Sequence, residues 1–538
     1  MKKIGLIIAF SALVCSAWAV PARRGEIVKT QPDGTQIVVY QHGDEHFHWM
    51  TNENGEWLKM DVDGFYRVTE ALSAEQIEAK RMAAPSRAAQ AATPLNIAPR
   101  GLVILVNFQD VAFETDKAEM DSMLMGKNYT RDYSYFYRGK KQSITSKGSA
   151  WQYFYDSSNG HYDPQFDVIG PVTVSKNMAY YGKNVSDFDA APWTMVKEAC
   201  QLVDDSVDFK QYDNNNDGYV DFVYVIYAGY GEADGGDKNT IWPHSYWLLE
   251  AGITCKLDGK YVDLYACGNE MDSRTNYHTG IGTFCHEFSH VLGLPDLYET
   301  TGYGTHKTIG AWSILDYGPY NNDGNTPPAY SAYEQFFMGW LMPRLIVDAE
   351  NVELEELQAS NSALLISSSD QHNLIGNDPK PTTFYLLENR QQVGWDEYLP
   401  GHGLMLTKVQ YDYNKWINNT VNNSSNRMGV DLIEADGKKP SSSSNGYTGK
   451  AGDLFPAGAT EYLGITNHSI EDVSEQDGII YFKYKGGIAT SAEQVQTEET
   501  IVAIYNILGQ KQAAVDIESL PHGTYVVVTT AGSKKIVR

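Results

Sequence analysis

One short segment, residues 286–296, constrains the fold more than any other feature of the sequence. His286 and His290 are four residues apart, so on a helix both imidazoles project from one face, with their Cβ atoms about 6 Å apart. Gly293 can adopt the positive φ that ends a helix, and the proline two residues later prevents the helix from resuming. The chain can therefore turn back and bring Asp296 toward the two imidazoles.

Two imidazoles and one carboxylate suit a zinc ion, with nitrogen–metal distances of about 2.0–2.1 Å and a fourth position left for water. We therefore predict His286, His290 and Asp296 as zinc ligands. Glu287 lies about 100° around the helix, too far to ligate with them but beside that water, which fits a general base. The alternative, a helix with two partner-bonded histidines, leaves Gly293 and Asp296 unexplained.

The pattern His-Glu-x-x-His-x-x-Gly-x-x-Asp resembles the metzincin clan, specifically the immune inhibitor A family of secreted bacterial metallopeptidases. The resemblance covers most of residues 20–485. It implies a zinc endopeptidase whose N-terminal propeptide is removed, with His286, His290 and Asp296 as ligands and Glu287 as base. Further matching text lies in residues 165–172, 241–244, 294–298, 387–391 and 399–403.

Metzincins carry a methionine turn beneath the zinc, and here the corresponding text is residues 312–318, with Leu315 in the methionine position. Leucine for methionine nearly conserves volume, so packing should change by less than about 1.5 kcal/mol. Tyr317 stands where some metzincins place a tyrosine that approaches the zinc. It is a candidate catalytic residue that would donate to the oxyanion, and the alternative is a core tyrosine beneath the helix.

A second metal motif runs from Asp213 to Asp221. Oxygen ligands at Asp213, Asn215 and Asp217, a glycine at position 6, the Tyr219 carbonyl and Asp221 match the first part of a calcium loop. The bidentate glutamate at position 12 is missing. We predict calcium binding, and the alternative is a polar turn capped by its own side chains.

The N-terminus predicts export. A basic start, an apolar run from Ile4 to Val14 and the triplet Ala17-Trp18-Ala19 form a signal peptide cleaved after Ala19, since the run is too short to span a bilayer. A lipoprotein modified on Cys15 is disfavoured by the bulky Val14. No other segment has the length and apolarity of a membrane span.

The sequence divides into five expected segments. Residues 1–19 are the signal peptide, 20–97 a propeptide and linker, 98–342 the catalytic domain, 343–486 a β-rich accessory domain and 487–538 a C-terminal sorting domain. The expected fold class is α+β (α/β-like) and metzincin-type for the catalytic domain, with all-β domains following it. Strand runs that alternate with helical patterns support the first part, and short strands with turn residues support the second.

The propeptide assignment depends on hairpin signals and an exposed linker. Asp33-Gly34, Asn54-Gly55 and Asp63-Gly64 separate short alternating runs. The Ala/Pro/Ser-rich residues 83–98 are open to cleavage. We expect the propeptide to keep the enzyme inactive until it is removed. Since no cysteine lies in this unit, it cannot do so by placing a thiolate on zinc. The candidate substitute is a carboxylate or histidine from residues 44–48.

Residues 487–538 resemble the C-terminal sorting domain of type IX secretion substrates. The basis is two strand runs, 501–510 and 520–528, and a basic end at 534–538. The segment departs from that pattern by lacking the upstream strand with its Tyr-Pro-Asn-Pro-like turn. The resemblance implies secretion machinery as a partner and an extracellular or cell-surface location.

The composition excludes other classes. The net charge of -26, from 42 Lys+Arg against 68 Asp+Glu, repels phosphate backbones, so nucleic acid is not expected as a partner. Four cysteines remain after signal cleavage, with Cys255 and Cys267 the nearest pair. They form no Cys-x-x-Cys zinc site. We expect a monomer.

Two rival functions remain open at this stage. The first is a zinc hydrolase that acts on cell-wall amides or esters, which could use the same site. The second is an adhesin with a decayed protease domain, and Leu315 is the only departure from the protease pattern that favours it. Other candidate residues are more simply structural, namely His244, His402, and the acidic group Asp431, Glu434 and Asp436. We therefore expect a secreted zinc endopeptidase that acts on protein or peptide substrates.

Overall fold

The computed structural model describes residues 20–44, 47–61, 63–73, 76–77, 100–185, 188–301, 306–439 and 448–487, with 501–506, 511–512, 524–529 and 532–537 near the C-terminus. The chain separates into two units, Met1–Gly487 and Ile488–Arg538. The predicted signal peptide and the linker at 83–98 lie outside the described residues.

The N-terminal segment forms an antiparallel sheet with the order β1-β2-β3-β4-β5. Its turns contain Gly34, Gly55 and Gly64, all with positive φ, so the predicted hairpin turns are confirmed. The strands are β1 (Ile27–Thr30), β2 (Gln36–Asp44), β3 (Phe47–Thr51), β4 (Trp57–Met60) and β5 (Tyr66–Val68).

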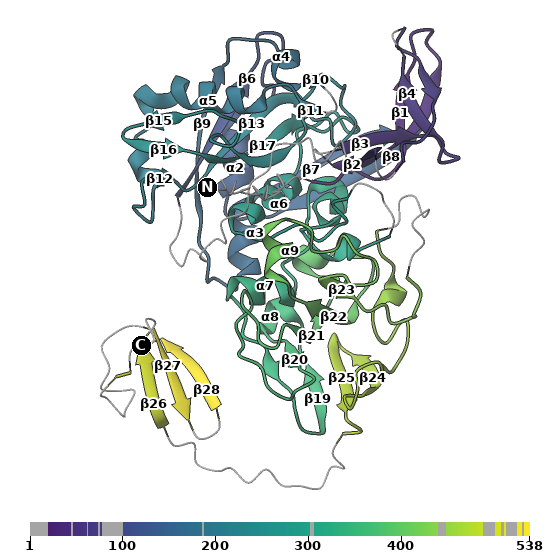
Figure 1. The fold of residues 1–538 in the computed structure, drawn as a ribbon, viewed down its shortest axis with the longest axis vertical. Helices are drawn as coiled ribbons and strands as arrows, with labels where there is room; N and C mark the ends of the chain where they lie inside the picture. Colours follow the sequence, from purple (N-terminus) through teal and green to yellow (C-terminus); the bar gives the residue numbers. More distant parts are fainter. Residues whose placement is uncertain are drawn as a thin grey trace, which may run out of the picture. The chain divides into compact units, whose positions relative to one another are not determined.

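A second sheet has the order β14-β17-β13-β6-β9 and is parallel except for the edge strand β14 (Figure 1). The apolar runs at 102–106 and 222–227, which favour buried strands, correspond to β6 and β13. The strands are β6 (Arg100–Asn107), β9 (Gln165–Thr173), β13 (Val223–Tyr230), β14 (His244–Trp247) and β17 (Leu264–Met271). Both faces of this sheet are covered, as expected for parallel strands with apolar runs.

Helices cover the two faces of this sheet. Val103 and Leu105 of β6 belong to one core with α2 (Lys117–Met125), α3 (Ala150–Ser157) and α6 (Gly282–Val291). Leu102, Ile104 and Val106 of the same strand belong to a second core with α4 (Met178–Gly182) and α5 (Pro192–Val203). Alternate residues therefore point to opposite layers. The mixed α/β class is confirmed.

Residues after α7 (Ala332–Met338) build two further sheets, with the orders β18-β20-β21-β22-β23 and β19-β25-β24. The first sheet contributes one face to the core that includes α6, whereas the second sheet packs against its other face in a separate core. Both sheets stay within the unit that ends at Gly487. The elements are β18 (Arg344–Leu345), β19 (Glu350–Leu354), α8 (Leu357–Ser360), β20 (Leu364–Ile366), β21 (Thr383–Arg390), β22 (Gly403–Gln410), α9 (Tyr413–Ile417), β23 (Val430–Leu432), β24 (Ile470–Gln476) and β25 (Ile479–Tyr484).

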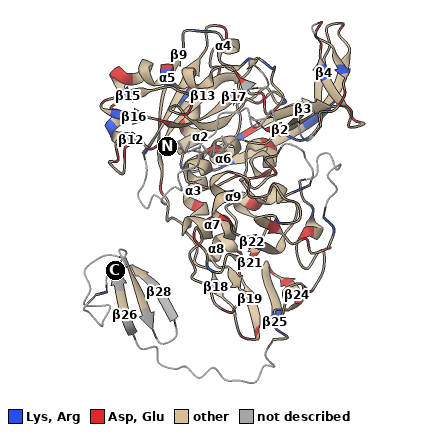
Figure 2. Cartoon of the chain, viewed as in Figure 1, with Lys and Arg blue, Asp and Glu red and all other residues tan. Residues whose placement is uncertain are grey.

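The C-terminal unit contains three antiparallel strands among its described residues, β26 (Ile501–Asn506), β27 (Thr524–Thr529) and β28 (Gly532–Val537). They lie where the sequence predicts hairpin-linked strands. None of the helices formed by the described residues is both long and apolar enough to cross a membrane. Lys and Arg positions are spread over several elements rather than gathered in one (Figure 2).

The four cysteines that follow the predicted signal peptide are all free and buried. Cys255, on β15 (Cys255–Leu257), hydrogen-bonds to the thiol of Cys200, whereas Cys267 lies on β17 next to His244. Cys255 and Cys267, the nearest pair in the sequence, therefore form no disulfide in this structure. Strand pairing places Val262 opposite Cys255, which separates the two cysteines.

Candidate metal centre

Helix α6 carries His286, Glu287 and His290, and it ends as the sequence predicts. Gly293 has a φ of 94°, and its N–H donates to the carbonyl of His290 over 2.8 Å. The chain then turns back, and the Leu294 carbonyl lies 2.8 Å from Nδ1 of His290. The glycine therefore both ends the helix and brings the following loop back to its last turn.

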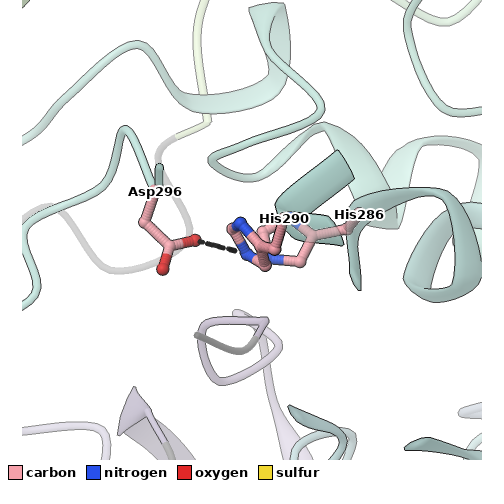
Figure 3. Close-up of side chains that lie close together, drawn as sticks. All are labelled: His286, His290 and Asp296. Carbon is pink, nitrogen blue, oxygen red and sulfur yellow. Dashed lines mark hydrogen bonds and ion pairs between the residues drawn. The ribbon is translucent and has the colours of Figure 1, made fainter. Parts of the chain in front are cut away.

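The predicted ligands converge (Figure 3). The Nε2 atoms of His286 and His290 are 3.0 Å apart, and Oδ1 of Asp296 lies 3.3 Å and 3.2 Å from them. Tetrahedral ligands at zinc–nitrogen distances of about 2.0–2.1 Å would be separated by about 3.3 Å. Among the residues that the structure describes, this is the only group of three or more His, Cys, Asp or Glu side chains arranged to hold a metal ion.

Hydrogen bonds fix which nitrogens face the ion. Nδ1 of His286 lies 2.7 Å from the Ile314 carbonyl, and Nδ1 of His290 contacts another carbonyl. Because a carbonyl only accepts, each Nδ1 carries the proton and each neutral ring presents an unprotonated Nε2. Oδ1 of Asp296 is buried without a hydrogen-bond donor. Three acceptor atoms this close repel one another, so the donor set fits a bound cation.

Ionisation states agree with that fit. Burial lowers the pKa of His290, which favours the neutral imidazole that a metal requires. Burial alone would raise the pKa of the Asp296 carboxyl, but His290 and His286 outweigh it and hold that pKa well below its ordinary value. Asp296 therefore stays an anion.

Asn419, which follows α9, is a site residue that the sequence did not reveal. Its Nδ2 donates to Oδ2 of Asp296 over 2.6 Å, and its Oδ1 accepts the Asp296 N–H over 2.8 Å. This pair of bonds orients the carboxylate so that Oδ1 faces the histidines. A lone asparagine more than a hundred residues away carries no local signal, and only the fold brings it here.

The segment predicted to be an altered methionine turn, residues 312–318, adjoins the candidate site. Leu315 is fully buried, and its carbonyl accepts the Leu297 N–H over 2.8 Å. The preceding carbonyl, that of Ile314, is the partner of His286. The backbone of this segment thus holds His286, a predicted metal ligand, while the Leu315 side chain packs in the hydrophobic core.

Glu287 contacts the N-terminal segment. The Val20 nitrogen donates to Oε1 of Glu287 over 2.9 Å, and the Val20 carbonyl accepts from the Trp242 indole over 3.1 Å. Val20 and Ala22 are almost completely buried here. The residues that follow the predicted signal cleavage site therefore lie against Glu287, beside the candidate metal centre.

Tyr317 faces the same segment. Its hydroxyl donates to the carbonyl of Ala22, and the Arg24 guanidinium lies 3.6 Å from the centre of its ring. Burial raises the pKa of this phenol to about 12, so it remains a donor. Tyr317 therefore already donates to a peptide carbonyl in the site, although that carbonyl is two residues from the nitrogen at Glu287.

The expected blocking residues, 44–48, lie elsewhere as far as they are described. His48 contacts Glu232 over 3.1 Å and stacks on Trp242 at 4.7 Å, while residues 45 and 46 lie outside the described residues. The segment that reaches Glu287 is instead Val20–Ala22. Sequence reasoning missed it because these residues have no ligand chemistry.

The predicted calcium loop has its oxygens turned inward, but they are occupied by protein donors. Asp213 accepts from the N–H groups of Asp217 and Gly218, each over 3.0 Å, and Lys260 Nζ lies 2.5 Å away. Asp221 accepts from the Asn214 N–H and amide. Asn215 accepts from the Asp217 N–H, and Asp217 from the Tyr219 N–H.

The remaining candidates have structural partners. His244 lies 2.7 Å from the Trp242 carbonyl and 2.9 Å from the Tyr265 hydroxyl, and His402 pairs with Glu475 over 2.9 Å. Asp431 and Asp436 form ion pairs with Lys439 and Lys450. Glu434 is partly buried, and this burial raises its pKa to about 7.

Comparison with known proteins identifies the class. Residues 96–342 match the family model described as "Immune inhibitor A peptidase M6, catalytic domain". This segment contains all three predicted zinc ligands and Glu287. The fold and this site are therefore similar to those of a metallopeptidase catalytic domain.

Two curated proteins are similar to about half of this chain. The chain is 26% identical over 291 residues to "Pre-pro-metalloprotease PrtV" of Vibrio cholerae serotype O1. The aligned region covers 48% of this chain and 31% of that protein. It is 27% identical over 268 residues to "Immune inhibitor A" of Bacillus thuringiensis subsp. alesti, which covers 44% and 39%. The chain thus spans less than two fifths of the length of these relatives. Residues 96–342 are thus similar to the catalytic domain of immune inhibitor A (peptidase M6) proteins.

Proposed function

We propose that the protein is a secreted zinc endopeptidase that hydrolyses peptide bonds of extracellular proteins. The observation that carries this is the convergence of His286, His290 and Asp296 within 3.3 Å, with Glu287 on the same helix. A zinc ion held by these three side chains would act as a Lewis acid, lowering the pKa of water toward about 7 and polarising a carbonyl.

Glu287 and Tyr317 have separate roles in the proposed reaction. Glu287 takes the proton from the attacking water and delivers it to the leaving nitrogen. The contact of its Oε1 with the Val20 nitrogen supports this role, because a peptide nitrogen already occupies the place where the leaving amine would stand. Tyr317 donates to a carbonyl of the bound chain, as it does to Ala22.

The same contacts support latency. Val20–Ala22 covers Glu287 and Tyr317, so the propeptide blocks the general base rather than placing a thiolate on the metal. If the signal peptide is removed after Ala19, the Val20 nitrogen becomes an ammonium, and its bond to a carboxylate is strengthened. We propose activation by a cut within residues 83–98, after which this segment can leave.

Casein digestion tests the function and the latency together. We expect the uncut chain to be nearly inactive and trypsin-treated protein to digest casein. A zinc chelator should abolish this activity and added zinc restore it. Protein collected from the medium should begin within residues 83–98. We propose that residues 487–538 engage the secretion machinery during export. Active secreted enzyme that begins near Val20 would refute latency, and failure of the matured protein on casein would favour a cell-wall substrate or a decayed domain.

We also propose that calcium binds Asp213, Asn215, Asp217, the Tyr219 carbonyl and Asp221. It would replace Lys260, whose ammonium now lies at Asp213. Calcium that binds the folded state alone adds about 2.7 kcal/mol at a hundredfold excess over its dissociation constant. We expect a higher Tm with calcium, reached at lower calcium concentration in Lys260→Met. Equal Tm values in excess calcium and in a calcium-selective chelator would contradict this.

A further inference from the structure

The side chain of Arg23 lies in a buried acidic pocket beside the active site. It is 7% exposed, its guanidinium contacts Asp272, and its Nη2 lies 2.7 Å from Oδ1 of Asp323. The guanidinium carbon is 5.8 Å from the centre of the Tyr320 ring. We call this the Arg23 pocket; its lining includes Asp234, Asn269, Asp272, Thr283, Tyr320 and Asp323.

The Arg23 pocket adjoins the catalytic helix. Thr283 of its lining belongs to α6, four residues before Glu287. Residues four apart on a helix share one face, so the pocket opens about one helical turn from the general base. A peptide bound at Glu287 is therefore within reach of the pocket.

The charges of the pocket are matched to a cation. Asp234, Asp272 and Asp323 line the pocket, and Arg274, which is not part of the lining, places its guanidinium against Asp323. Burial and Asp272 raise the pKa of Asp234 to about 8, and Arg23 counteracts this. Oδ1 of Asp234 is buried without a hydrogen-bond donor. Without Arg23 the pocket holds excess buried negative charge, which a replacement cation would relieve.

The position of residues 20–23 also indicates how a substrate would align with Glu287. The Val20 nitrogen lies 2.9 Å from Glu287, the residue that protonates the leaving nitrogen in the proposed reaction. Val20 thus corresponds to the first residue after a cleaved bond, and Arg23 to the fourth. Three extended residues span about 10 Å. Hydrogen bonds from the Arg23 N–H to Ala233 and from Tyr317 to Ala22 hold this stretch in place.

We propose that the Arg23 pocket is a substrate subsite that selects arginine, and more weakly lysine, at the fourth residue after the cleaved bond. This rests on the proposed peptidase function and adds a substrate class to it. Arginine is favoured because its planar guanidinium contacts two carboxylates at once and packs near Tyr320, whereas an ammonium offers a single point charge.

The test uses trypsin-matured enzyme and fluorogenic peptides that differ only in the fourth residue after the bond. The series carries Val-Pro-Ala followed by Arg, Lys, Met or Glu, which copies the chain's own order at residues 20–23. We expect kcat/KM for the Arg peptide to exceed that for the Met peptide by about tenfold or more, as charged hydrogen bonds imply. The Glu peptide should be the poorest.

Asp272→Asn identifies the pocket as the cause. Asparagine keeps an oxygen that can accept the N–H groups of Arg274 and Thr275 but removes the charge. The Arg-to-Met ratio should fall toward one in this variant and in Asp323→Asn. The control Asp208→Asn removes an equal charge from an exposed side chain outside the pocket and should keep the ratio of the parent.

The possible results distinguish failure of the subsite proposal from failure of the proposed peptidase function. Equal kcat/KM for the Arg and Met peptides in the parent, or a ratio unchanged in both pocket variants, overturns the subsite while leaving the peptidase standing. A parent that cleaves neither these peptides nor casein refutes the proposed function, and the subsite with it.

Discussion

Replacing Glu287 with alanine is expected to lower kcat/KM on protein substrates by about 10²–10⁴-fold while zinc stays bound. The carboxylate lies on α6 between the two histidines proposed as ligands, and its Oε1 contacts the peptide nitrogen of Val20. Alanine removes the proton carrier without touching the ligands or their carbonyl partners. Casein digestion and zinc content, both measured on trypsin-matured protein, check this.

Matched variants sharpen the result. His286→Ala should lose both zinc and activity, because it removes a ligand held by the Ile314 carbonyl. Glu287→Ala protein that digests casein near the parent rate would show that another group carries the proton.

Tyr317→Phe belongs to the same experiment. Loss of its bond to a substrate carbonyl should lower kcat/KM by about tenfold or more. A fall in kcat indicates a bond to the oxyanion, and a rise in KM indicates a bond to a neighbouring carbonyl, such as that of Ala22. Normal turnover with a lower Tm would show that Tyr317 is a core residue that contributes to packing rather than to catalysis.

Arg390→Met is expected to destabilise the protein by about 3–5 kcal/mol, since it strips the partner from buried carboxylates. Arg390 is fully buried on β21, with Nε and Nη2 at 2.7 Å and 2.6 Å from the Asp396 oxygens and Nη1 at 3.2 Å from Glu388. Burial raises the pKa of Glu388 to about 7, even though Arg390 acts to lower it.

This network also supports the metal site. Glu388 accepts the Ala332 N–H at the start of α7, and Glu334 of that helix accepts the Ser313 hydroxyl over 2.5 Å. Ser313 belongs to the turn beneath the zinc ligands. We therefore expect Arg390→Met to lose zinc at lower urea concentration as well.

Urea unfolding measured beside Lys147→Met provides the comparison. Lys147 pairs with Glu397 at the surface over 3.2 Å, with its side chain 61% exposed, and such pairs contribute about 0–1 kcal/mol. Similar unfolding midpoints for the two variants would show that the buried network adds no more than a surface ion pair.

The local chemistry of the site could be predicted from sequence because it depends on short spacings. His286 and His290 share a helix face by the period of the helix, and Gly293 supplies the positive φ that returns the chain to Asp296. The buried strands could be predicted too, since the apolar runs that became β6 and β13 are typical of a covered parallel sheet.

Only the tertiary structure determined which distant residues complete the site. Asn419 orients Asp296, Val20 contacts Glu287, and Arg23 enters an acidic pocket, across separations of 123, 267 and 249 residues. The hydrogen-bonding groups of Val20 belong to the backbone, and Asn419 and Arg23 are common residue types, so neither spacing nor composition marks them. Their roles arise where packed elements bring buried donors and acceptors together, because such groups must be satisfied within the fold.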